Sequence, residues 1–377
     1  MKKFLDCISI VGATPSKFHG TKKYISTGAV ATTEIDESEV VEVTYEDRPS
    51  RANLSAEAGD ILFAKMQGTR KTLLLDSETE KNIYSTGFYA IRANPEVITT
   101  ECLYYLIDSE LFLAQKDKNC SGATQKAITN GGMAKIEISV PPLSEQGILV
   151  DKLKHLTQLI ADKKKQLNLF DEIIKSRFIE LFGDPVYNTK KLPTKRLAEL
   201  GSLDRGRSQH RPRNAPELLG GPYPLIQTGE VANAGLYITG YSNTYSELGL
   251  KQSKMWKAGT LCITIAANIA QTSILTFDAC FPDSVVGFIP GDSISAIYMH
   301  YWFGFFQKIL EEQAPQVAQK NINLKILSDL SVVVPNQEQQ KDFIAFVEQT
   351  DKSKFEIQQS LEKLEILKKS LMQQYFG

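Results

Sequence analysis

Residues 144–182 read SEQGILVDKLKHLTQLIADKKKQLNLFDEIIKSRFIELF, and this stretch decides the architecture of the chain. Its seam positions recur at alternating steps of four and three residues, with Lys163 and Arg177 as polar interruptions. The apolar seam positions are Leu149, Leu153, Leu156, Ile160, Leu167, Phe170, Ile174 and Leu181. Side chains spaced in this way line one face of a helix and form the seam of a coiled coil. The stretch therefore predicts a long helix that needs another helix beside it.

The partner is predicted to be a second copy of the same helix. Adding 194 to every seam position gives Phe343, Val347, Thr350, Lys354, Ile357, Leu361, Leu364, Lys368, Leu371 and Tyr375. A Pro-x-x-Glu-Gln motif precedes both copies, at Pro142–Gln146 and Pro335–Gln339, and both copies close on Phe-Gly. Two matched helices half a chain apart indicate an internal duplication. Each half then consists of a globular part followed by a long helix.

Composition limits the class of protein. The chain has 377 residues, 42% of them hydrophobic, which is enough for two cores of ordinary size. Its 43 Lys and Arg balance 44 Asp and Glu, so local charge rather than net charge must indicate a nucleic-acid partner. The 5 cysteines lack metal-site spacing and fit a reducing compartment, and the longest apolar run, 294–306, is too short to span a bilayer. We expect a cytoplasmic protein with no cofactor, no metal and no membrane partner.

The two globular parts share landmarks and differ in their loops. The matched segments are Tyr24–Val30 with Leu225–Val231, Ala58–Leu62 with Ala258–Cys262, and Gln125–Lys126 with Gln319–Lys320. In the first part we expect strands at Ile61–Ala64, Leu73–Leu75 and Gly87–Ile91, and a helix at Glu101–Ala114. A kept scaffold with divergent loops predicts two mixed α/β domains that bind in the same way and recognise different things.

The most basic stretch of the chain, 190–213, is a candidate DNA contact. Its cations are Lys190, Lys191, Lys195, Arg196, Arg205, Arg207, Arg211 and Arg213, and Gly206 and Pro212 mark it as a loop. Arginine side chains suit phosphates and the acceptor edge of guanine. We therefore select Arg205, Arg207, His210, Arg211 and Arg213 as DNA-binding candidates, and Lys17, Lys22 and Lys23 in the weaker matching stretch of the first part. The alternative is a solvated charged loop.

A polar loop follows each Ala-Gly strand and gives a second group of candidates. Amide side chains can bond adenine at two atoms and arginine can do so with guanine, so such loops can read bases. The candidates are Lys65, Gln67, Arg70 and Lys71 in the first part, Asn268, Gln271 and Thr272 in the second, and the lysines of the matched Gln-Lys pairs, Lys126 and Lys320. The alternative here is ordinary turn chemistry.

Catalytic motifs find little support in the chain. Asp184-Pro185-Val186-Tyr187 resembles an adenine-methyltransferase motif, but Val186 stands where that motif has a second proline, and no glycine-rich cofactor loop follows a strand. No phosphate loop with Lys-Ser or Lys-Thr exists, and the Asp-x-Lys spacing at Asp162 falls on the coiled-coil helix. A methyltransferase or nuclease is thus one competing interpretation, and a coiled-coil scaffold that binds only proteins is another.

The order of these pieces resembles the specificity subunit of type I restriction–modification systems over essentially the whole chain. The most specific pieces are Val140–Gln146, Phe182–Pro185, His210–Arg213, Gly220–Pro224, Ala258–Leu261 and Gln319–Ile322. The resemblance implies an α+β fold with two similar mixed α/β target-recognition domains. Two long helices would separate and join these domains as an antiparallel coiled coil with pseudo-two-fold symmetry. The expected bounds are 1–142 and 184–335 for the domains, and 143–183 and 336–377 for the helices.

The same resemblance implies a function without catalysis. Each domain would read one half of an asymmetric bipartite site in double-stranded DNA, and the helices would set the spacing. Two DNA-methyltransferase (modification) subunits would dock beside the helices, and restriction/translocase subunits would complete the complex. The first domain departs from the pattern because it lacks the arginine-rich stretch 205–213. The specificity subunit of a type II-like enzyme is an alternative within the same broad system.

Overall fold

The computed structural model describes residues 1–266, 269–313 and 322–377. It divides into two compact units, unit 1 (Met1–Lys165 with Gln358–Gly377) and unit 2 (Gln166–Ile357). Each long helix, α4 (Leu143–Phe182) or α10 (Gln337–Phe376), contributes part of its length to both units. Within the described residues, no helix is long and apolar enough to cross a membrane.

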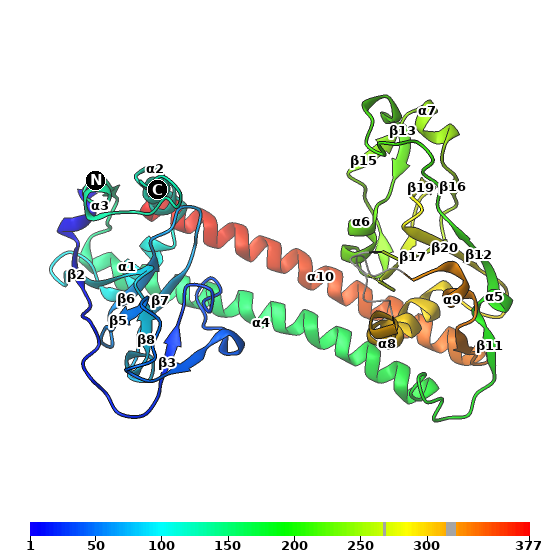
Figure 1. Ribbon diagram of the computed structural model, residues 1–377, viewed down its shortest axis with the longest axis horizontal. Coiled ribbons are helices and arrows are strands. Elements are labelled where there is room, and N and C mark those ends of the chain that lie inside the picture. The colour runs from blue at the N-terminus through cyan, green and yellow to red at the C-terminus, as the bar shows by residue number, and fades with distance from the viewer. Residues whose placement is uncertain (267–268, 314–321) are drawn as a thin grey trace. The chain divides into compact units, whose positions relative to one another are not determined.

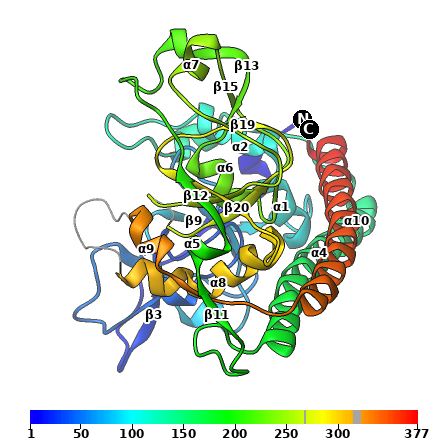
Figure 2. The ribbon, with the colours of Figure 1, turned by 90° about the vertical axis from the view of Figure 1, so that its right-hand side faces the viewer.

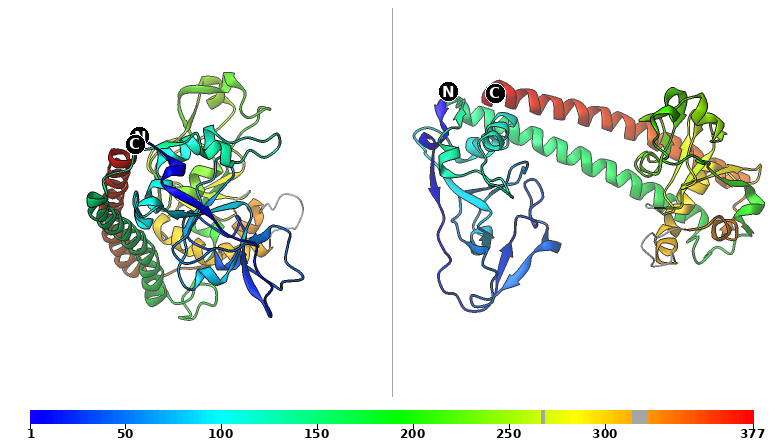
Figure 3. Two further views of the ribbon diagram at one scale, coloured as in Figure 1. Left: turned by 90° about the vertical axis from the view of Figure 1, so that its left-hand side faces the viewer. Right: turned by 45° about the horizontal axis from the view of Figure 1, so that its top comes forward.

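The two long helices lie side by side and run in opposite directions (Figures 1 and 3). In unit 1, the ammonium of Lys164 is 3.0 Å from a carboxylate oxygen of Glu365, and in unit 2 Lys354 is 2.6 Å from Asp171. Every predicted seam position is buried or half-buried. The predicted antiparallel coiled coil is therefore confirmed.

The helices are also part of the core of each unit. In unit 2, the Phe178 ring of α4 stacks on Tyr298 of α8 (Ala296–Gln313) with 5.2 Å between centroids, and it meets Phe343 of α10 edge-on at 5.4 Å. Figure 2 shows α8 beside the paired helices. In unit 1, Leu153 of α4 and Phe376 of α10 belong to the same buried cluster as the strands of the first sheet. Burial of these apolar side chains is what joins helices to sheets.

Unit 1 contains two four-stranded sheets. The first has the order β2 (Ile8–Val11), β9 (Phe88–Ala93), β6 (Ile61–Ala64), β7 (Thr72–Leu74). The second has the order β4 (Val41–Val43), β3 (Lys22–Ile25), β8 (Ile83–Ser85), β5 (Ala52–Leu54). The remaining elements are β1 (Lys2–Lys3), paired with β10 (Glu137–Ile138), and the helices α1 (Thr100–Ile107), α2 (Glu110–Lys118) and α3 (Asn130–Met133).

Unit 2 repeats this order. Its first sheet is β12 (Gly201–Arg205), β20 (Val285–Pro290), β17 (Leu261–Thr264), β18 (Thr272–Leu275) and an added β14 (Tyr237–Ile238). Its second sheet is β15 (Asn243–Tyr245), β13 (Leu219–Leu225), β19 (Ala279–Cys280), β16 (Met255–Trp256). The others are β11 (Thr194–Arg196), paired with β21 (Ser331–Val333), and α5 (Leu197–Leu200), α6 (Thr228–Asn233), α7 (Glu247–Lys251) and α9 (Leu324–Ser328). The fold class predicted from the duplicated pattern is confirmed.

One turn shows how closely the scaffold repeats. Gly59 and Gly259 both have φ +87°, a conformation that favours glycine. Their N–H groups donate to the carbonyls of Leu75 and Leu275, each at 2.8 Å. The strands β6 and β17 follow directly. The Ala-Gly landmark is therefore a glycine-dependent turn that aligns two strands in each unit.

The helix expected at Glu101–Ala114 is wrong as a single element. The chain forms α1 and then α2, with a break at Asp108–Ser109. The Ser109 hydroxyl accepts from the N–H of Phe112 and caps α2, while the Asp108 carboxylate is buried against Arg70. The prediction failed because the apolar spacing continues across the break, so the sequence pattern alone does not reveal the cap at Ser109.

A buried glutamine fixes the start of each long helix against its unit. The Gln146 amide donates to the carbonyls of Val97 and Pro141, and its oxygen accepts from the N–H of Thr99 at 2.8 Å. In unit 2 the amide of Gln340 makes the matching three bonds to Ser293, Pro335 and Ser295. The alignment of Gln146 with Gln339 by the Pro-x-x-Glu-Gln letters is thus wrong by one residue. The true equivalents follow the 194-residue offset of the seam.

Candidate nucleic-acid interface

The arginine-rich loop of unit 2 joins β12 to β13. At its start the N–H of Gly206 donates to the Val285 carbonyl at 2.9 Å. A Cβ at Gly206 would lie 2.3 Å from the carbonyl oxygen of Phe281, which is closer than real Cβ atoms come. The absence of a side chain therefore lets the loop press against the turn that precedes β20.

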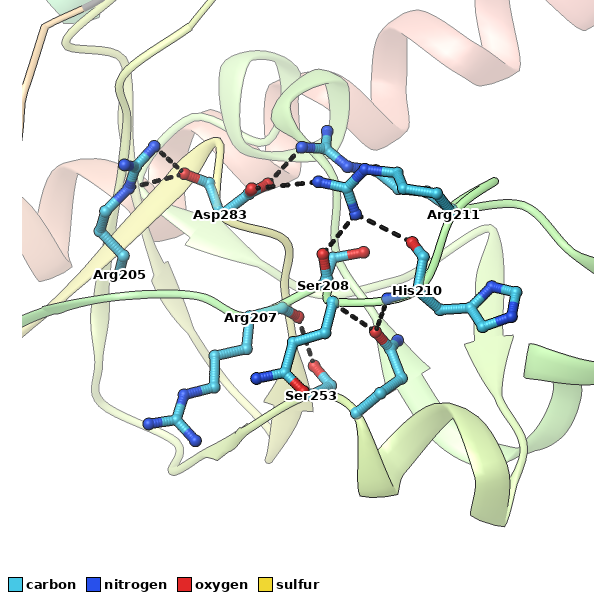
Figure 4. Close-up of polar contacts among 10 residues, drawn as sticks. Arg205, Arg207, Ser208, His210, Arg211, Ser253 and Asp283 are labelled. Atoms are coloured by element: carbon cyan, nitrogen blue, oxygen red, sulfur yellow. Dashed lines mark hydrogen bonds and ion pairs between the residues drawn. The ribbon is translucent and has the colours of Figure 1, made fainter.

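The backbone of the loop is also held from its other side. The side-chain oxygen of Gln252 accepts from the N–H groups of Gln209 and His210 at 2.6 and 3.1 Å, and the Ser253 hydroxyl donates to the Arg207 carbonyl at 2.9 Å (Figure 4). Backbone contacts on both sides give the loop a defined path. The backbone positions from which its side chains extend are therefore fixed.

Three of the predicted arginines converge on Asp283. The guanidinium of Arg205 donates to the main-chain oxygen of Asp283 from Nε at 3.0 Å and from Nη2 at 2.7 Å. Nη2 of Arg213 lies 2.5 Å from Oδ1 of the Asp283 carboxylate, and Nη2 of Arg211 lies 3.5 Å from Oδ2. Arg211 also donates from Nη1 to the carbonyls of Ser208 and His210. Figure 4 shows this cluster.

Arg207 and His210 lie outside the cluster. Arg207 is exposed and extends away from Asp283, and among the described residues its side chain makes no hydrogen bond or ion pair (Figure 4). Among the described residues, the only polar contact of the exposed His210 ring is with the Pro212 carbonyl, at 3.3 Å. The structure thus brings Arg205, Arg211 and Arg213 together on Asp283 and leaves the exposed side chain of Arg207 available to a ligand.

The corresponding segment of unit 1, the loop after β2 together with the start of β3, distributes its cations among separate partners. Lys17 faces Glu46 at 3.9 Å, Lys23 binds Glu37 at 2.7 Å, and the Lys22 ammonium lies 5.3 Å from the centre of the Phe18 ring. These three side chains do not share one acceptor. They are half-exposed or exposed, so an anion can still reach them.

The polar loop of unit 1 meets the second matched segment. Its N–H at Gln67 donates to the Lys126 carbonyl at 2.9 Å, and the N–H of Ile128 donates to the Lys65 carbonyl at 2.9 Å. Lys116 of α2 supports this loop from beneath. Its side chain is 1% exposed, and its ammonium donates to the carbonyls of Met66 and Thr69 at 3.1 and 2.6 Å. Sequence reasoning missed Lys116, because nothing in its spacing distinguishes it from a solvated lysine.

Most side chains of this loop are already engaged within unit 1. Arg70 makes a two-pronged ion pair with Asp108, at 2.7 and 2.9 Å, and Lys71 donates to the Thr27 carbonyl at 2.6 Å. The Lys65 ammonium donates to Thr86 and sits 4.3 Å from the centre of the Tyr89 ring, where burial lowers its pKa. Gln67 donates to the Asp117 carbonyl at 3.2 Å. Lys126 is exposed and lies beside them.

The polar loop of unit 2 is only partly described. Asn268 and Lys320 lie outside the described residues. Gln271 is half-buried and lines a cavity of about 420 Å³ with Asp171 and Lys175. Thr272 is 7% exposed and its hydroxyl is 3.0 Å from Nδ1 of His300, so it cannot meet DNA directly in this conformation. Burial lowers the pKa of His300 to about 4.

In the described parts of the chain, no three His, Cys, Asp or Glu side chains gather as metal ligands. In the Asp-Pro-Val-Tyr segment, Oδ1 of Asp184 accepts from the N–H groups of Val186 and Tyr187, at 2.8 and 3.3 Å. This carboxylate therefore caps the turn after α4.

Comparison with protein families identifies a match over most of the chain. The family described as type I restriction modification DNA specificity domain matches twice, at residues 10–169 and 190–368. Each match contains one set of sheets and part of a long helix. The internal duplication is thus a duplication of this domain.

Three similar proteins add detail. The HindI type I restriction enzyme specificity subunit of Haemophilus influenzae is 23% identical over 165 residues, 43% of this chain and 35% of that protein, so the match spans about a third of its length. A chain solved to explain complex assembly and conformational transition of a type I R-M system superimposes with TM-score 0.56, at 20% identity over 98% of this chain and 97% of that one. The type I S subunit from M. genitalium gives 0.57, at 12% identity over 100% and 95%. At these identities the two structures show a shared fold.

Proposed function

This chain belongs to the family of type I restriction–modification DNA specificity domains, and from that premise we propose that it recognises the DNA sequence for such a system. Each unit reads one half of an asymmetric bipartite target in double-stranded DNA. The two units share one strand order and differ in the loops between strands. Equal scaffolds with unequal loops support two half-sites of different sequence.

The arginine cluster of unit 2 carries the proposal. Three guanidinium groups converge on Asp283, those of Arg205 at the end of β12 and of Arg211 and Arg213 on the loop that follows, and Arg207 on the same loop lies beside them. The backbone of this loop is held from both sides. Guanidinium groups bind phosphates and can donate two hydrogen bonds to guanine. In a chain whose formal net charge is −1, this local concentration of cations supports nucleic-acid contact. In unit 1 the proposed contacts are Lys17, Lys22, Lys23, Lys65, Gln67 and Lys126, whereas Arg70 and Lys71 are engaged by Asp108 and by the Thr27 carbonyl.

The chain itself carries out no chemistry in this proposal and needs no cofactor. The boundaries are those expected from the sequence, with domains at 1–142 and 184–335 and spacer helices at 143–183 and 336–377. A type II-like enzyme and a protein-binding scaffold are the alternatives. The arginine cluster favours DNA over the scaffold, and the family match favours the type I system.

Two modification (methyltransferase) subunits dock along the helices, and restriction/translocase subunits join them. Large apolar side chains on the outer faces of both helices support this. On α10, Ile366 is 68% exposed and Leu367 53%, and on α4 Ile148 is 62% exposed. Exposed apolar side chains of this kind mark protein contacts. Ile366→Asp with Leu367→Asp should abolish co-purification of the modification subunit without unfolding the chain.

The deciding experiment compares methylated motifs in cells with and without this gene. We expect one bipartite motif to disappear, and an unchanged pattern would contradict the proposal. Arg207→Ala should then weaken binding of the assembled complex. Loss of a base contact should lower affinity by ~1–3 kcal/mol and relax one position of the second half-site, whereas loss of a phosphate contact should lower affinity on every duplex. Lys257→Ala is the control, because Lys257 is an exposed cation of unit 2 outside the stretch 190–213 and is paired with Asp278.

A further inference from the structure

Asp283 stands at the centre of the arginine cluster, in the turn between β19 and β20. Its carboxylate is divided between two guanidinium groups, with Oδ1 facing Arg213 and Oδ2 facing Arg211. Its main-chain oxygen holds Arg205 instead. Replacing the carboxylate would therefore release two arginines and leave the third in place.

The held arginines keep donors for a ligand. Arg213 bonds Asp283 through Nη2, so its Nε and Nη1 still carry hydrogens that can point elsewhere. Arg211 uses Nη2 for Asp283 and Nη1 for two carbonyls of its own loop. A guanidinium held in this way has lost rotational freedom before DNA binds. It can donate to DNA only from the N–H groups that are not already bonded.

The carboxylate also affects binding to the wrong DNA. Free arginines on a flexible loop contact any phosphate, because phosphate binding needs charge and reach but no base sequence. Arginines paired with Asp283 must exchange a carboxylate for a phosphate before they make such a contact. An acidic residue near a phosphate also opposes binding through like charge.

We propose that Asp283 is a positioning residue that sets sequence discrimination in unit 2, by holding Arg211 and Arg213 for base-directed contact and away from indiscriminate phosphate contact. This inference rests on the proposed function in DNA recognition. In this proposal Asp283 acts on the DNA only through the two arginines.

The test is Asp283→Asn in the assembled complex, measured on the duplex that carries the methylated motif and on a scrambled duplex at several salt concentrations. We expect the ratio of the two affinities to fall at least tenfold while binding to scrambled DNA stays the same or tightens. The plot of log affinity against log salt for scrambled DNA should steepen by about 1–2, because one or two released arginines can each neutralise a phosphate.

Asp278→Asn is the matched control. It removes the same charge from the preceding turn of the same unit, where Asp278 binds Lys257 at 2.7 Å. It should leave the affinity ratio unchanged. Asp283→Glu keeps the carboxylate and should retain most of the discrimination, which provides a readout if the asparagine variant folds poorly.

The outcomes distinguish a failure of the proposed function from a failure of the proposed role of Asp283. If the unchanged protein does not prefer the motif duplex, the proposed function fails. If it does, and Asp283→Asn keeps the full ratio, the role of Asp283 is refuted. Equal weakening on both duplexes together with a lower melting temperature would show a purely structural carboxylate and would overturn the inference as well.

Discussion

The loops that join β2 to β3 and β12 to β13 occupy the same place in the two units and organise charge differently. In unit 1, Lys17 and Lys23 have separate acidic partners. In unit 2, three arginines share Asp283, and Arg207 extends away from it. The helix starts, in contrast, are the same, because Gln146 and Gln340 make three matching hydrogen bonds. After duplication the chain kept the joints that position its loops and changed the loops themselves.

The largest effects should come from the helix residues that belong to each core. Phe178→Ala in unit 2 and Leu153→Ala in unit 1 each remove a side chain that is 0% exposed, at an expected cost of about 3–5 kcal/mol in unfolding free energy. Hydrogen exchange followed by mass spectrometry should show loss of protection mainly in the unit that carries the change. Equal loss of protection in both units would show that the chain unfolds as a single cooperative body, and the two units would then not differ in local stability.

The hydrogen bonds of the two buried glutamines at the helix starts should contribute equally to stability. Gln146→Ala and Gln340→Ala each leave one N–H group and two carbonyls without their bonds, at an expected cost of about 2–3 kcal/mol. Urea denaturation of both variants should give values within about 0.5 kcal/mol of each other. Gln158→Ala is the control, because the exposed Gln158 bonds only Asp162 on its own helix in the described contacts. A large difference between the two joints would contradict their equivalence.

The loss of folding stability at acid pH should come in part from His300, a residue of unit 2. Burial lowers the pKa of His300 to about 4, from an ordinary 6.5, whereas the equivalent position in unit 1 is Tyr104. Below pH 6.5 the unfolded chain binds a proton there and the folded chain does not. Stability from this group is therefore complete above pH 6.5 and is lost as the pH falls towards 4, by roughly 3 kcal/mol.

His300→Asn should remove that part of the pH dependence. The measurement is the difference between unfolding free energies at pH 7 and pH 4.5, with His155→Gln on the exposed face of α4 as the control. If His300→Asn keeps the full difference, the acid sensitivity comes from carboxylates elsewhere.

The smallest expected effect separates structural from DNA-binding cations. Arg70→Ala should lower stability by about 1 kcal/mol, because Asp108 loses its partner, and should change DNA affinity little. Arg207→Ala should do the reverse. Thermal melts and duplex binding of the two variants, measured together, check this. An affinity loss for Arg70→Ala as large as that for Arg207→Ala would place Arg70 in the interface after all.

The repeated helices could be predicted because their pattern is local and long. The alternating four and three spacing extends through 149–181 and returns 194 residues later, so no single position decides it. The one-residue error at Gln146 arose because the letters Glu-Gln occur in both copies one step out of phase. The position of a residue around the helix axis decides which groups its side chain can bond. The spacing of the seam gives that position, and the Pro-x-x-Glu-Gln motif does not.

The organisation of the site could be predicted only in part. Arginine density located the loop, since four guanidinium groups within nine residues are visible in the sequence. Asp283 lies 70 residues from Arg213 and 78 from Arg205 and carries no motif, so its role depends on the pairing of β12 with β20. Lys116 is similar, because only the fold brings it under the loop at Met66.

The division of the chain between its units has a consequence for synthesis on the ribosome. Met372 and Phe376 belong to the core of unit 1, whereas unit 2 needs nothing beyond Ile357. Domains usually complete their folding in the order in which they are translated. Here unit 2, whose synthesis begins later, is the first to have all its residues. Unit 1 has all its residues only after the final turns of α10 have been synthesised. Until then the part of its core that Met372 and Phe376 cover is exposed, and exposed apolar surface of this kind favours aggregation and the binding of chaperones.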